Sequence, residues 1–329
     1  MNQIMIKNIV LIIGTTLACF CFPKINFGQA PNFGTTSSFA LFTANGAFSN
    51  NGSATIVTGD VGTNAGAFTA FPTGTVDGQI HVVDAASAQA AIDVASAYTD
   101  LNGVTCGSIL GTPFGNSQIL TPGVYCQGSA SFLNGNITLD GQGDPNALFI
   151  IKIGGALSTS SNSNVILINA ASANNVYWQI GGQFDLGDGS IFRGTLVVDG
   201  AINLLEGSTL YGKGLSITGA IALHNTIVTT YPVSAGIITG TASVCQTQTG
   251  VNYSVSAITN ATGYVWTLPT GATISSGSNT NAITVDYSAS AVDGTITVQG
   301  TNDSGFGNVS ANYSVTVTPV ILTSAIYHY

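Results

Sequence analysis

Carboxylates between positions 185 and 206 are the residues whose types and spacing come nearest to supporting chemistry. Asp185, Asp188, Asp199 and Glu206 lie close together in the sequence, and oxygen ligands of this kind bind Ca²⁺ in proteins. A glycine directly follows both Asp188 and Asp199, however, and Asp-Gly is a common turn dipeptide. We therefore interpret these residues as turn formers and predict no metal site.

Catalysis would need basic groups or paired carboxylates that meet in one groove. Beyond the first thirty residues the only lysine and arginine side chains are Lys152, Arg193 and Lys213, which stand at unrelated points of the sequence. His81 and His224 have no evident catalytic partner, and we interpret His81 as a packing residue at the start of a helix. The sequence therefore predicts a protein that is not an enzyme, with no catalytic residue and no cofactor.

The N-terminus has the pattern of a secretory signal peptide. Lys7 precedes an apolar run at 9–22, and small residues follow near 28–30. We predict a signal peptide at 1–30 and a mature chain that begins near Pro31. Because no later apolar run is long enough for a membrane helix, we expect no integral membrane span in the mature chain. The predicted location is secreted or extracellular, with association to the cell surface as an option.

Export permits disulfides, and three cysteines remain after the predicted signal: Cys106, Cys126 and Cys245. Cys106 and Cys126 would close a short loop, so we predict a disulfide between them, which contributes about 3 kcal/mol in the chain-entropy model. Cys245 is then the odd cysteine. The alternative, three free thiols that bind a metal, lacks the CxxC spacing and the nearby histidine of zinc sites.

The charge balance limits the partners of this chain. It has 329 residues, of which 14 are acidic and five are lysine or arginine, and its formal net charge is −9. We therefore expect no nucleic-acid partner, because too few cations are present to replace the counterions of a phosphate backbone. Anionic membrane surfaces are disfavoured for the same reason. The hydrophobic content of 45% is enough for a large core of short strands joined by turns.

The elements that position these side chains repeat between residues 122 and 230. Each repeat contains an apolar, β-rich run, a glycine-containing corner and a leucine-centred run. The apolar runs are 147–155, 175–182, 194–200 and 214–219, and the leucine-centred runs surround Leu157, Leu186, Leu204 and Leu223. This repeat predicts a solenoid, because a single coil cannot bury its own apolar face and must stack on its neighbours. Stacked rungs lie about 4.7–4.9 Å apart, so we expect flat, regularly spaced faces.

Two faces of the predicted coils differ in pattern. The first run of each repeat is apolar at consecutive positions, which predicts strands covered on both sides. The alanine-rich segment 84–101, with Asp84 as N-cap and Gly103 as its stop, predicts one helix that covers this face through Ala91 and Ala95. The leucine-centred runs alternate between apolar and polar residues, so their face is expected to be open to solvent.

A different pattern follows the solenoid. From residue 236 to 319, longer alternating strands with a turn about every ten residues predict an immunoglobulin-like β-sandwich. Trp266 is the predicted core tryptophan of this sandwich. We assign 231–235 as a linker and 320–329 as a C-terminal tail.

Strings of residues in a fixed order resemble one known family, the microbial ice-binding (antifreeze) proteins; these strings are 58–62, 81–89, 120–125, 139–150 and 175–180. That family is built as a discontinuous right-handed β-helix with one flanking helix. The resemblance implies an all-β-dominated chain, in which residues 31–230 form an irregular right-handed β-helix with one flanking α-helix, followed by the C-terminal Ig-like β-sandwich.

Residues 236–318 resemble the PKD-like or Ig-like modules of secreted Bacteroidetes proteins. In such modules an early cysteine often pairs with a cysteine in a Thr-Asn-x-Cys-Gly stretch. The matching stretch 301–305 has Ser304 in place of that cysteine, so the resemblance implies that Cys245 is unpaired. A module of this type could contact a cell surface or an extracellular matrix.

The resemblance also implies a function, namely adsorption to an ice crystal surface through the flat leucine-centred face, with inhibition of ice growth or recrystallisation. Hydroxyl and amide side chains on such a face can hold ordered water, whereas carboxylates predict moderate or weak activity. The candidate residues of the ice-binding face lie around the four leucines: Ser158, Thr159, Ser160, Asp185, Asp188, Asn203, Glu206, His224, Asn225 and Thr226. The alternatives are an extracellular adhesion or matrix protein that uses the same scaffold without touching ice, and a solvated wall that binds nothing.

Overall fold

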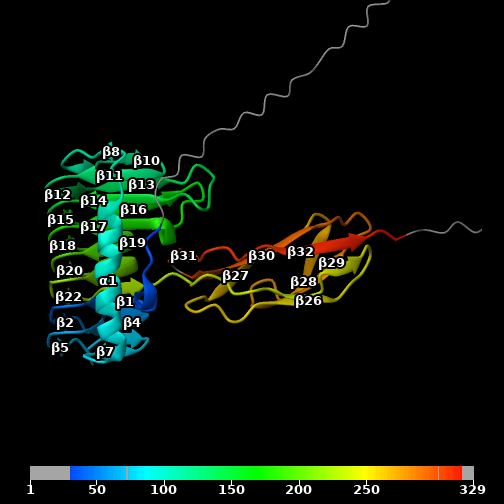
Figure 1. Cartoon of the computed structure of the whole chain (residues 1–329), viewed down its shortest axis with the longest axis horizontal. Helices are drawn as coiled ribbons and strands as arrows, with labels where there is room; N and C mark the ends of the chain where they lie inside the picture. Colours follow the sequence, from blue (N-terminus) through cyan, green and yellow to red (C-terminus); the bar gives the residue numbers. More distant parts are fainter. Residues whose placement is uncertain (1–29, 72, 303, 321–329) are drawn as a thin grey trace, which may run out of the picture.

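The computed structural model describes residues 30–71, 73–302 and 304–320. They form a stack of β-coils, flanked by one long helix, and a separate β-sandwich (Figure 1). The predicted signal peptide lies outside the described residues except for Ala30, and the predicted tail lies outside them except for Val320. Among the described residues, no helix combines the length and apolarity that a membrane crossing requires.

The coils form a β-helix with three faces, and every strand pair in it is parallel. Face a consists of β8 (Ser108–Ile109), β11 (Gly123–Gln127), β14 (Phe149–Ile153), β17 (Val176–Ile180), the second halves of β19 (Ile191–Val198) and β21 (Thr209–Ser216), β1 (Phe39–Thr43), β4 (Asp60–Thr63) and β7 (Ile80–Val82). Face b consists of β9 (Phe114–Gly115), β12 (Ser131–Asn134), β15 (Leu157–Thr159), β18 (Phe184–Leu186), β20 (Ile202–Leu204), β22 (Ile221–Leu223), β2 (Phe48–Asn50) and β5 (Phe68–Thr69). Face c consists of β10 (Gln118–Leu120), β13 (Asn136–Asp140), β16 (Asn164–Ile168), the first halves of β19 and β21, β23 (Ile227–Thr229), β3 (Ile56–Thr58) and β6 (Thr75–Asp77).

The order of strands in the stack differs from their order in the sequence. Strand β1 lies between β21 and β4, so the first coils of the chain stack directly on the last one. Helix α1 (Ala85–Gly103) follows β7 at one end of the stack and leads to β8 at the other end (Figure 1). This discontinuous β-helix with one flanking helix confirms the predicted fold class.

Helix α1 forms where the sequence predicts it and covers face a. Asp84 is the N-cap, its side chain accepts the backbone N–H of Ser87, and the Ser87 hydroxyl accepts the backbone N–H of Asp84, which is a capping-box arrangement. The buried residues of the helix pack on apolar side chains of face a: Ala90, Val94 and Leu101 join a cluster with Phe39, Phe42, Val124, Ile150, Val197 and Leu215. The predicted coverage of the doubly apolar strands is therefore confirmed.

The predicted contact residues of the helix need a correction. Ala95 is exposed and Ala91 is half-buried, whereas Ala90 and Ala97 are fully buried. The prediction for Ala95 was wrong because the alanine-rich composition leaves the rotation of the helix undetermined. His81 does lie at the helix start, with Nδ1 2.8 Å from Asp84 Oδ2 and its ring packed on Phe39.

The C-terminal domain is a sandwich of two small sheets, as predicted. One sheet contains β24 (Thr239–Gly240), β26 (Val251–Ser254), β29 (Ala282–Tyr287) and β28 (Ala272–Ser276), and the other contains β25 (Ser243–Cys245), β32 (Tyr313–Thr318), β30 (Gly294–Asn302), β27 (Gly263–Thr267) and β31 (Gly305–Phe306). Trp266 is buried in the core, and its Nε1 donates to the carbonyl of Thr280 at 2.9 Å, which satisfies the indole N–H. The predicted core tryptophan is therefore confirmed.

The cysteines pair as predicted. Cys106 and Cys126 form a disulfide, and Cys245 is free and exposed. Cys245 pairs in register with Thr318 at the end of the sandwich where β30 begins, whereas Ser304 follows the other end of this nine-residue strand, about 30 Å away. A cysteine at position 304 would therefore not reach Cys245 in this fold.

The segment expected as a linker begins with a buried anchor. The hydroxyl of Tyr231 accepts the backbone N–H of Gly194 at 2.8 Å and donates to the carbonyl of Tyr211. On the sandwich side, Asn302 Nδ2 donates to the carbonyl of Thr230 at 2.9 Å. These bonds hold the sandwich against the side of the β-helix that includes face c, and face b lies on the opposite side (Figure 1).

Candidate functional site

Most strands of face b are three residues long, and their middle side chain points out of the coil. In β18, for example, Phe184 and Leu186 are fully buried and Asp185 between them is partly exposed, as the alternation of a β-strand requires. The strand register then aligns the outward side chains of successive coils in one central row: Phe132, Ser158, Asp185, Asn203, Ala222, Ser49 and Thr69.

A second row on face b is almost entirely alanine. From β12 to β5 the residue before each strand is partly or fully exposed, and in every case but Ala130 its carbonyl accepts a hydrogen bond from the backbone of a neighbouring coil. This row contains Ala130, Ala156, Gln183, Ala201, Ala220, Ala47 and Ala67, so Gln183 is its one long side chain. Because successive rungs are about 4.7–4.9 Å apart and most of the side chains are short, the two rows form a flat surface apart from Phe132 and Gln183.

The centre of face b contains a hydrogen-bonded polar cluster. Gln183 Nε2 donates to both carboxylate oxygens of Asp185, at 2.7 and 2.8 Å, and Asn203 Nδ2 donates to Asp185 Oδ1 at 2.6 Å. The carboxylate therefore has donors from two neighbouring positions on the face. On the coils below this cluster, the central row continues through Ala222, Ser49 and Thr69, which carry only methyl and hydroxyl groups.

Three of the predicted face residues lie in the central row, and two others are buried. Ser158, Asp185 and Asn203 point outward, as predicted. Thr159 and Thr226 are 6% and 0% exposed, so their assignment to the face was wrong. The strand alternation that turns Ser158 outward turns Thr159 inward, where its hydroxyl accepts the backbone N–H of Gly187 at 2.9 Å.

The remaining predicted residues border face b at its corner with face c. Asp188 Oδ1 accepts the backbone N–H of Glu206 at 3.1 Å, and Glu206 Oε1 accepts Asn225 Nδ2 at 2.8 Å. His224 belongs to the same corner, and Ser160 bonds to Ser163 and the backbone N–H of Gly135; these positions bring polar groups to the edge of the face.

The predicted turn at Asp188 and Gly189 is confirmed. Among the described residues, no group of three or more His, Cys, Asp or Glu side chains has a geometry that could hold a metal ion.

The N-terminal coils contribute two side chains to face b that were not predicted. Ser49 and Thr69 enter the central row because β2 and β5 stack on β22, a long-range pairing that no local pattern indicates. A local signal does exist: an alanine directly precedes the apolar residue that opens the strand, at 47–48, 67–68, 156–157, 201–202 and 220–221. This dipeptide opens five of the eight strands of face b, on both sides of the helix in the sequence.

Each lysine and arginine side chain in the described part of the chain donates hydrogen bonds to backbone carbonyls. Lys152 Nζ donates to the carbonyls of Asn102 and Val104 at 2.8 Å each and so caps the C-terminal end of α1. Lys213 Nζ donates to the carbonyls of Ser37 and Phe39, and burial lowers the pKa of this lysine to about 8.

Arg193 has the same role on another side of the coils. Its Nη1 donates to Asn164 Oδ1 at 2.7 Å and to the carbonyl of Val165 at 2.6 Å. The three cations are therefore structural and lie in three different places.

The fold and this face place the chain in a known class. The family model described as ice-binding-like matches residues 42–229, more than half of the chain, and the chain belongs to this family. A second model, described as a PKD-like domain, matches residues 231–315.

Among its relatives, the chain is 37% identical over 201 residues to an ice-binding protein of Nostoc sp. (strain HG1), which is 58% of this chain and 70% of the relative. It is 29% identical over 211 residues to an ice-binding protein of Flavobacterium frigoris (strain PS1), which is 60% of this chain and 75% of the relative.

Solved structures agree with this assignment. An ice-binding protein from an Antarctic Flavobacteriaceae bacterium superposes with a TM-score of 0.61 at 42% identity, and the match covers 64% of this chain and 51% of that chain. An ice-binding protein from the Antarctic ascomycete Antarctomyces psychrotrophicus superposes with a TM-score of 0.58 at 32% identity, and the match covers 61% of this chain and 98% of that chain. The chain thus spans about half of the first protein and nearly all of the second.

Proposed function

We propose that this protein is a secreted ice-binding protein that adsorbs to ice crystals through face b and inhibits their growth or recrystallisation. The observation that carries the proposal is the pair of short-side-chain rows on face b, aligned in register over successive coils, in a chain whose relatives are named ice-binding proteins. No reaction and no cofactor form part of this proposal.

The chemistry of face b suits contact with ordered water. Methyl groups of the alanine row and hydroxyls such as Ser49, Thr69 and Ser158 can border water without binding it as strongly as ions do, because neutral groups are less strongly hydrated than charges. The rigid parallel ladder keeps these groups at a fixed spacing. Helix α1 covers face a and the sandwich lies on the side of face c, so face b is the face left free for a large flat partner (Figure 1).

The two halves of face b should contribute unequally to adsorption. The lower coils with Ala222, Ser49 and Thr69 offer small neutral groups, whereas the upper coils carry the Asp185 carboxylate and the 39% exposed ring of Phe132. A carboxylate keeps its own hydration shell, and a protruding ring holds the surface away from a plane. We therefore expect moderate or weak activity that is concentrated in the lower coils.

The proposal is tested on the purified full-length protein by thermal hysteresis and by its incorporation into a growing ice hemisphere. The variant Ala222→Tyr places a bulky side chain in the central row and should abolish both signals while it leaves the melting temperature unchanged. The matched control is Ile227→Tyr, because Ile227 lies on the same coil but on face c, where it is 42% exposed. This control should retain full ice adsorption.

An extracellular adhesion or matrix protein without affinity for ice is the competing function. Absence of ice shaping and of ice incorporation at high protein concentration would favour this alternative and overturn the proposal. Removal of residues 232–329 should leave ice adsorption unchanged, since the ice-binding-like family model matches residues 42–229 and ends before this segment. Secretion is tested by N-terminal sequencing of the protein from the culture medium, which should begin near Pro31.

A further inference from the structure

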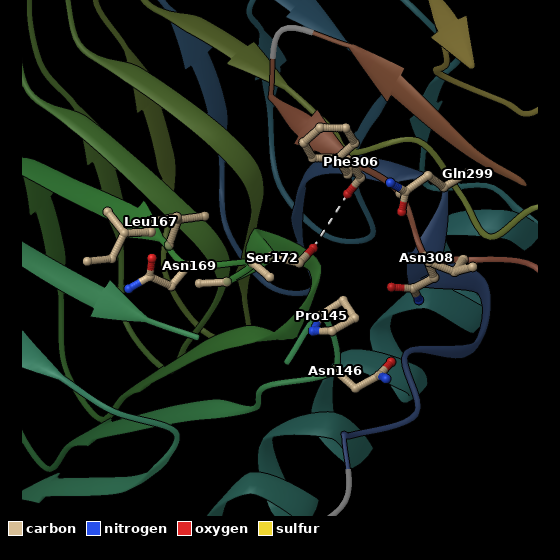
Figure 2. A pocket seen from close by; sticks show the side chains of 13 residues that line it. Pro145, Asn146, Leu167, Asn169, Ser172, Gln299, Phe306 and Asn308 are labelled. Atoms are coloured by element: carbon tan, nitrogen blue, oxygen red, sulfur yellow. Dashed lines mark hydrogen bonds between the residues drawn. The ribbon is translucent and has the colours of Figure 1, made fainter. Parts of the chain in front are cut away.

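A cavity of about 330 Å³ lies between the β-helix and the sandwich. One wall is formed by the loops that follow β13 and β16, and the other by β30, β31 and the segment after them (Figure 2). Its volume falls at the lower end of the range of small-molecule sites, about 300–1,000 Å³, and such sites are common at domain interfaces. It is on the side of the molecule away from face b (Figure 1).

The cavity combines an aromatic ring with apolar walls. Phe306 is 53% exposed and lines the cavity from β31, although a large apolar side chain gains by burial. Leu167 and Ile168 at the end of β16 line the opposite wall (Figure 2). An aromatic face carries a partial negative charge that attracts the slightly positive C–H groups of a ligand.

Side-chain amides supply the polar groups of the cavity. Among the described residues, the amide groups of Asn146 and Gln299 have no hydrogen-bond partner, and Asn308 uses only its Nδ2, which donates to Ser234 Oγ at 3.3 Å. Each free amide offers both donors and an acceptor. The three amides therefore present unused hydrogen-bonding groups from both domains around one space (Figure 2).

None of the described residues that line the cavity is charged. An ionic ligand would lose its hydration without gaining an opposite charge, which is unfavourable. A neutral ligand that has hydroxyl groups on its rim and C–H groups on its face matches the lining in both respects. Sugar rings have this chemistry.

Side-chain hydrogen bonds hold the walls of the cavity in place. Asn174 Nδ2 donates to the carbonyl of Phe306 at 3.0 Å and so links the two walls. Asn169 and Ala170 adopt positive φ angles of 49° and 66°, and Ala170 has no polar side chain that would favour this conformation. Asn169 Nδ2 donates to Asp140 Oδ1 at 2.9 Å, which ties the two loops of the β-helix wall together.

We propose that this interdomain cavity binds a neutral oligosaccharide, with Phe306 stacked on a sugar ring and the amides of Asn146, Gln299 and Asn308 bonded to its hydroxyls. The site is separate from face b, so the protein can hold a neutral polysaccharide and ice at the same time.

The test uses the full-length protein and a panel of neutral hexasaccharides of glucose, mannose and N-acetylglucosamine. Saturation-transfer NMR and titration should detect at least one binder, and Phe306→Ala should weaken it by about tenfold, as expected for the loss of one aromatic contact. Gln299→Ala should weaken it by a smaller factor. The matched control is Phe132→Ala, which removes an exposed ring from face b and should leave saccharide binding unchanged.

Ice adsorption serves as an independent readout of folding and of the other site. Phe306→Ala should keep wild-type ice adsorption and melting temperature, and Ala222→Tyr should keep saccharide binding. The inference is overturned if no neutral hexasaccharide binds, if a polygalacturonate hexamer binds in preference to all neutral ones, or if Phe132→Ala and Phe306→Ala weaken binding equally. Failure of ice adsorption would leave these results untouched.

Discussion

Faces a and b belong to the same coils, yet their outward side chains are opposite in kind. On face a the outward residues include Phe39, Ile150 and Val197, which are fully buried beneath helix α1. On face b the corresponding positions hold small or polar residues such as Ala222, Ser49 and Ser158, and no element of the described part of the chain covers them (Figure 1). Both sheets have the same parallel pairing, so the backbone does not account for the difference.

Whether another element packs on a face therefore determines which outward side chains are favourable there. A bulky apolar residue gains free energy by burial only where another element packs on it, at about 25 cal/mol per Å² of apolar area. On an uncovered face a bulky apolar side chain gains no free energy by burial, and short side chains keep the face flat.

Removal of the disulfide should have the largest effect on stability. The Cys106–Cys126 bond joins the segment after α1 to β11 and closes a loop with a sequence separation of 20 residues, so Cys106→Ser with Cys126→Ser should lower the free energy of unfolding by about 3 kcal/mol. Denaturant unfolding of the oxidised protein and the double variant measures this. Peptide mapping without reduction that links Cys245 to either partner would contradict the pairing.

Overfilling the covered face should cost slightly less. Ala97 is fully buried between α1 and face a, so Ala97→Phe should destabilise the protein by about 1–3 kcal/mol. Ala95→Phe is the matched control on the exposed side of the same helix, and its effect should stay within about 0.5 kcal/mol. Equal unfolding free energies for the two variants would show that the helix does not pack as described.

Making the uncovered face more uniform should raise activity modestly. Asp185→Thr replaces the carboxylate in the central row of face b and should increase thermal hysteresis by a small factor, because a hydroxyl and a methyl group disturb ordered water less than an ion. Asp188→Thr changes a residue at the corner, where Asp188 bonds to the backbone of Glu206, and should leave thermal hysteresis unchanged. The reverse ranking of the two variants would place the contact surface at the corner.

The smallest effect concerns the acid stability of the helix that covers face a. The hydrogen bond from the backbone N–H of Ser87, with a second from His81, lowers the pKa of Asp84 from its ordinary value to about 2. A lowered folded-state pKa gives stability that is present above pH 4 and is lost as the pH falls through 2. Asp84→Asn keeps a capping oxygen but not the titration, so its melting temperature should fall less between pH 4 and pH 2. Parallel slopes for wild type and variant would contradict this account.

Local patterns predicted most of the elements of this molecule. The N-cap at Asp84, the doubly apolar strands that need cover, the core position of Trp266 and the Cys106–Cys126 pair all follow from residue types and short spacings. The residues of the candidate face were harder to predict, because they depend on which residue of each strand faces outward. The candidate residues were chosen because they lie near a leucine in the sequence, and so they included Thr159. The alternation of the strand turns the side chain of Thr159 inward.

The stacking of distant coils lies beyond local patterns altogether. Ser49 and Thr69 join face b only through pairing of β2 with β22 and β5, and the position of these coils is set by packing over the whole stack. The cavity beside Phe306 has the same origin, because it combines side chains from two domains that the sequence separates widely. Its amides and its ring show no spacing that would have grouped them beforehand.

The first coils of the chain stack on the last one, and this stacking order affects how the chain folds. The Thr43 hydroxyl donates to the carbonyl of Gly219, 176 residues away, and β1 pairs with β21. In an ordinary repeat array each unit needs only its sequence neighbours, so the array can assemble from one end and fray from either. Here β1, β2 and β3 pair on one edge with the next coils of the chain, but their other edges have no partner until β21, β22 and β23 have been synthesised. Contacts of such high sequence separation slow folding, and they join the two ends of the β-helix segment into a single cooperative unit.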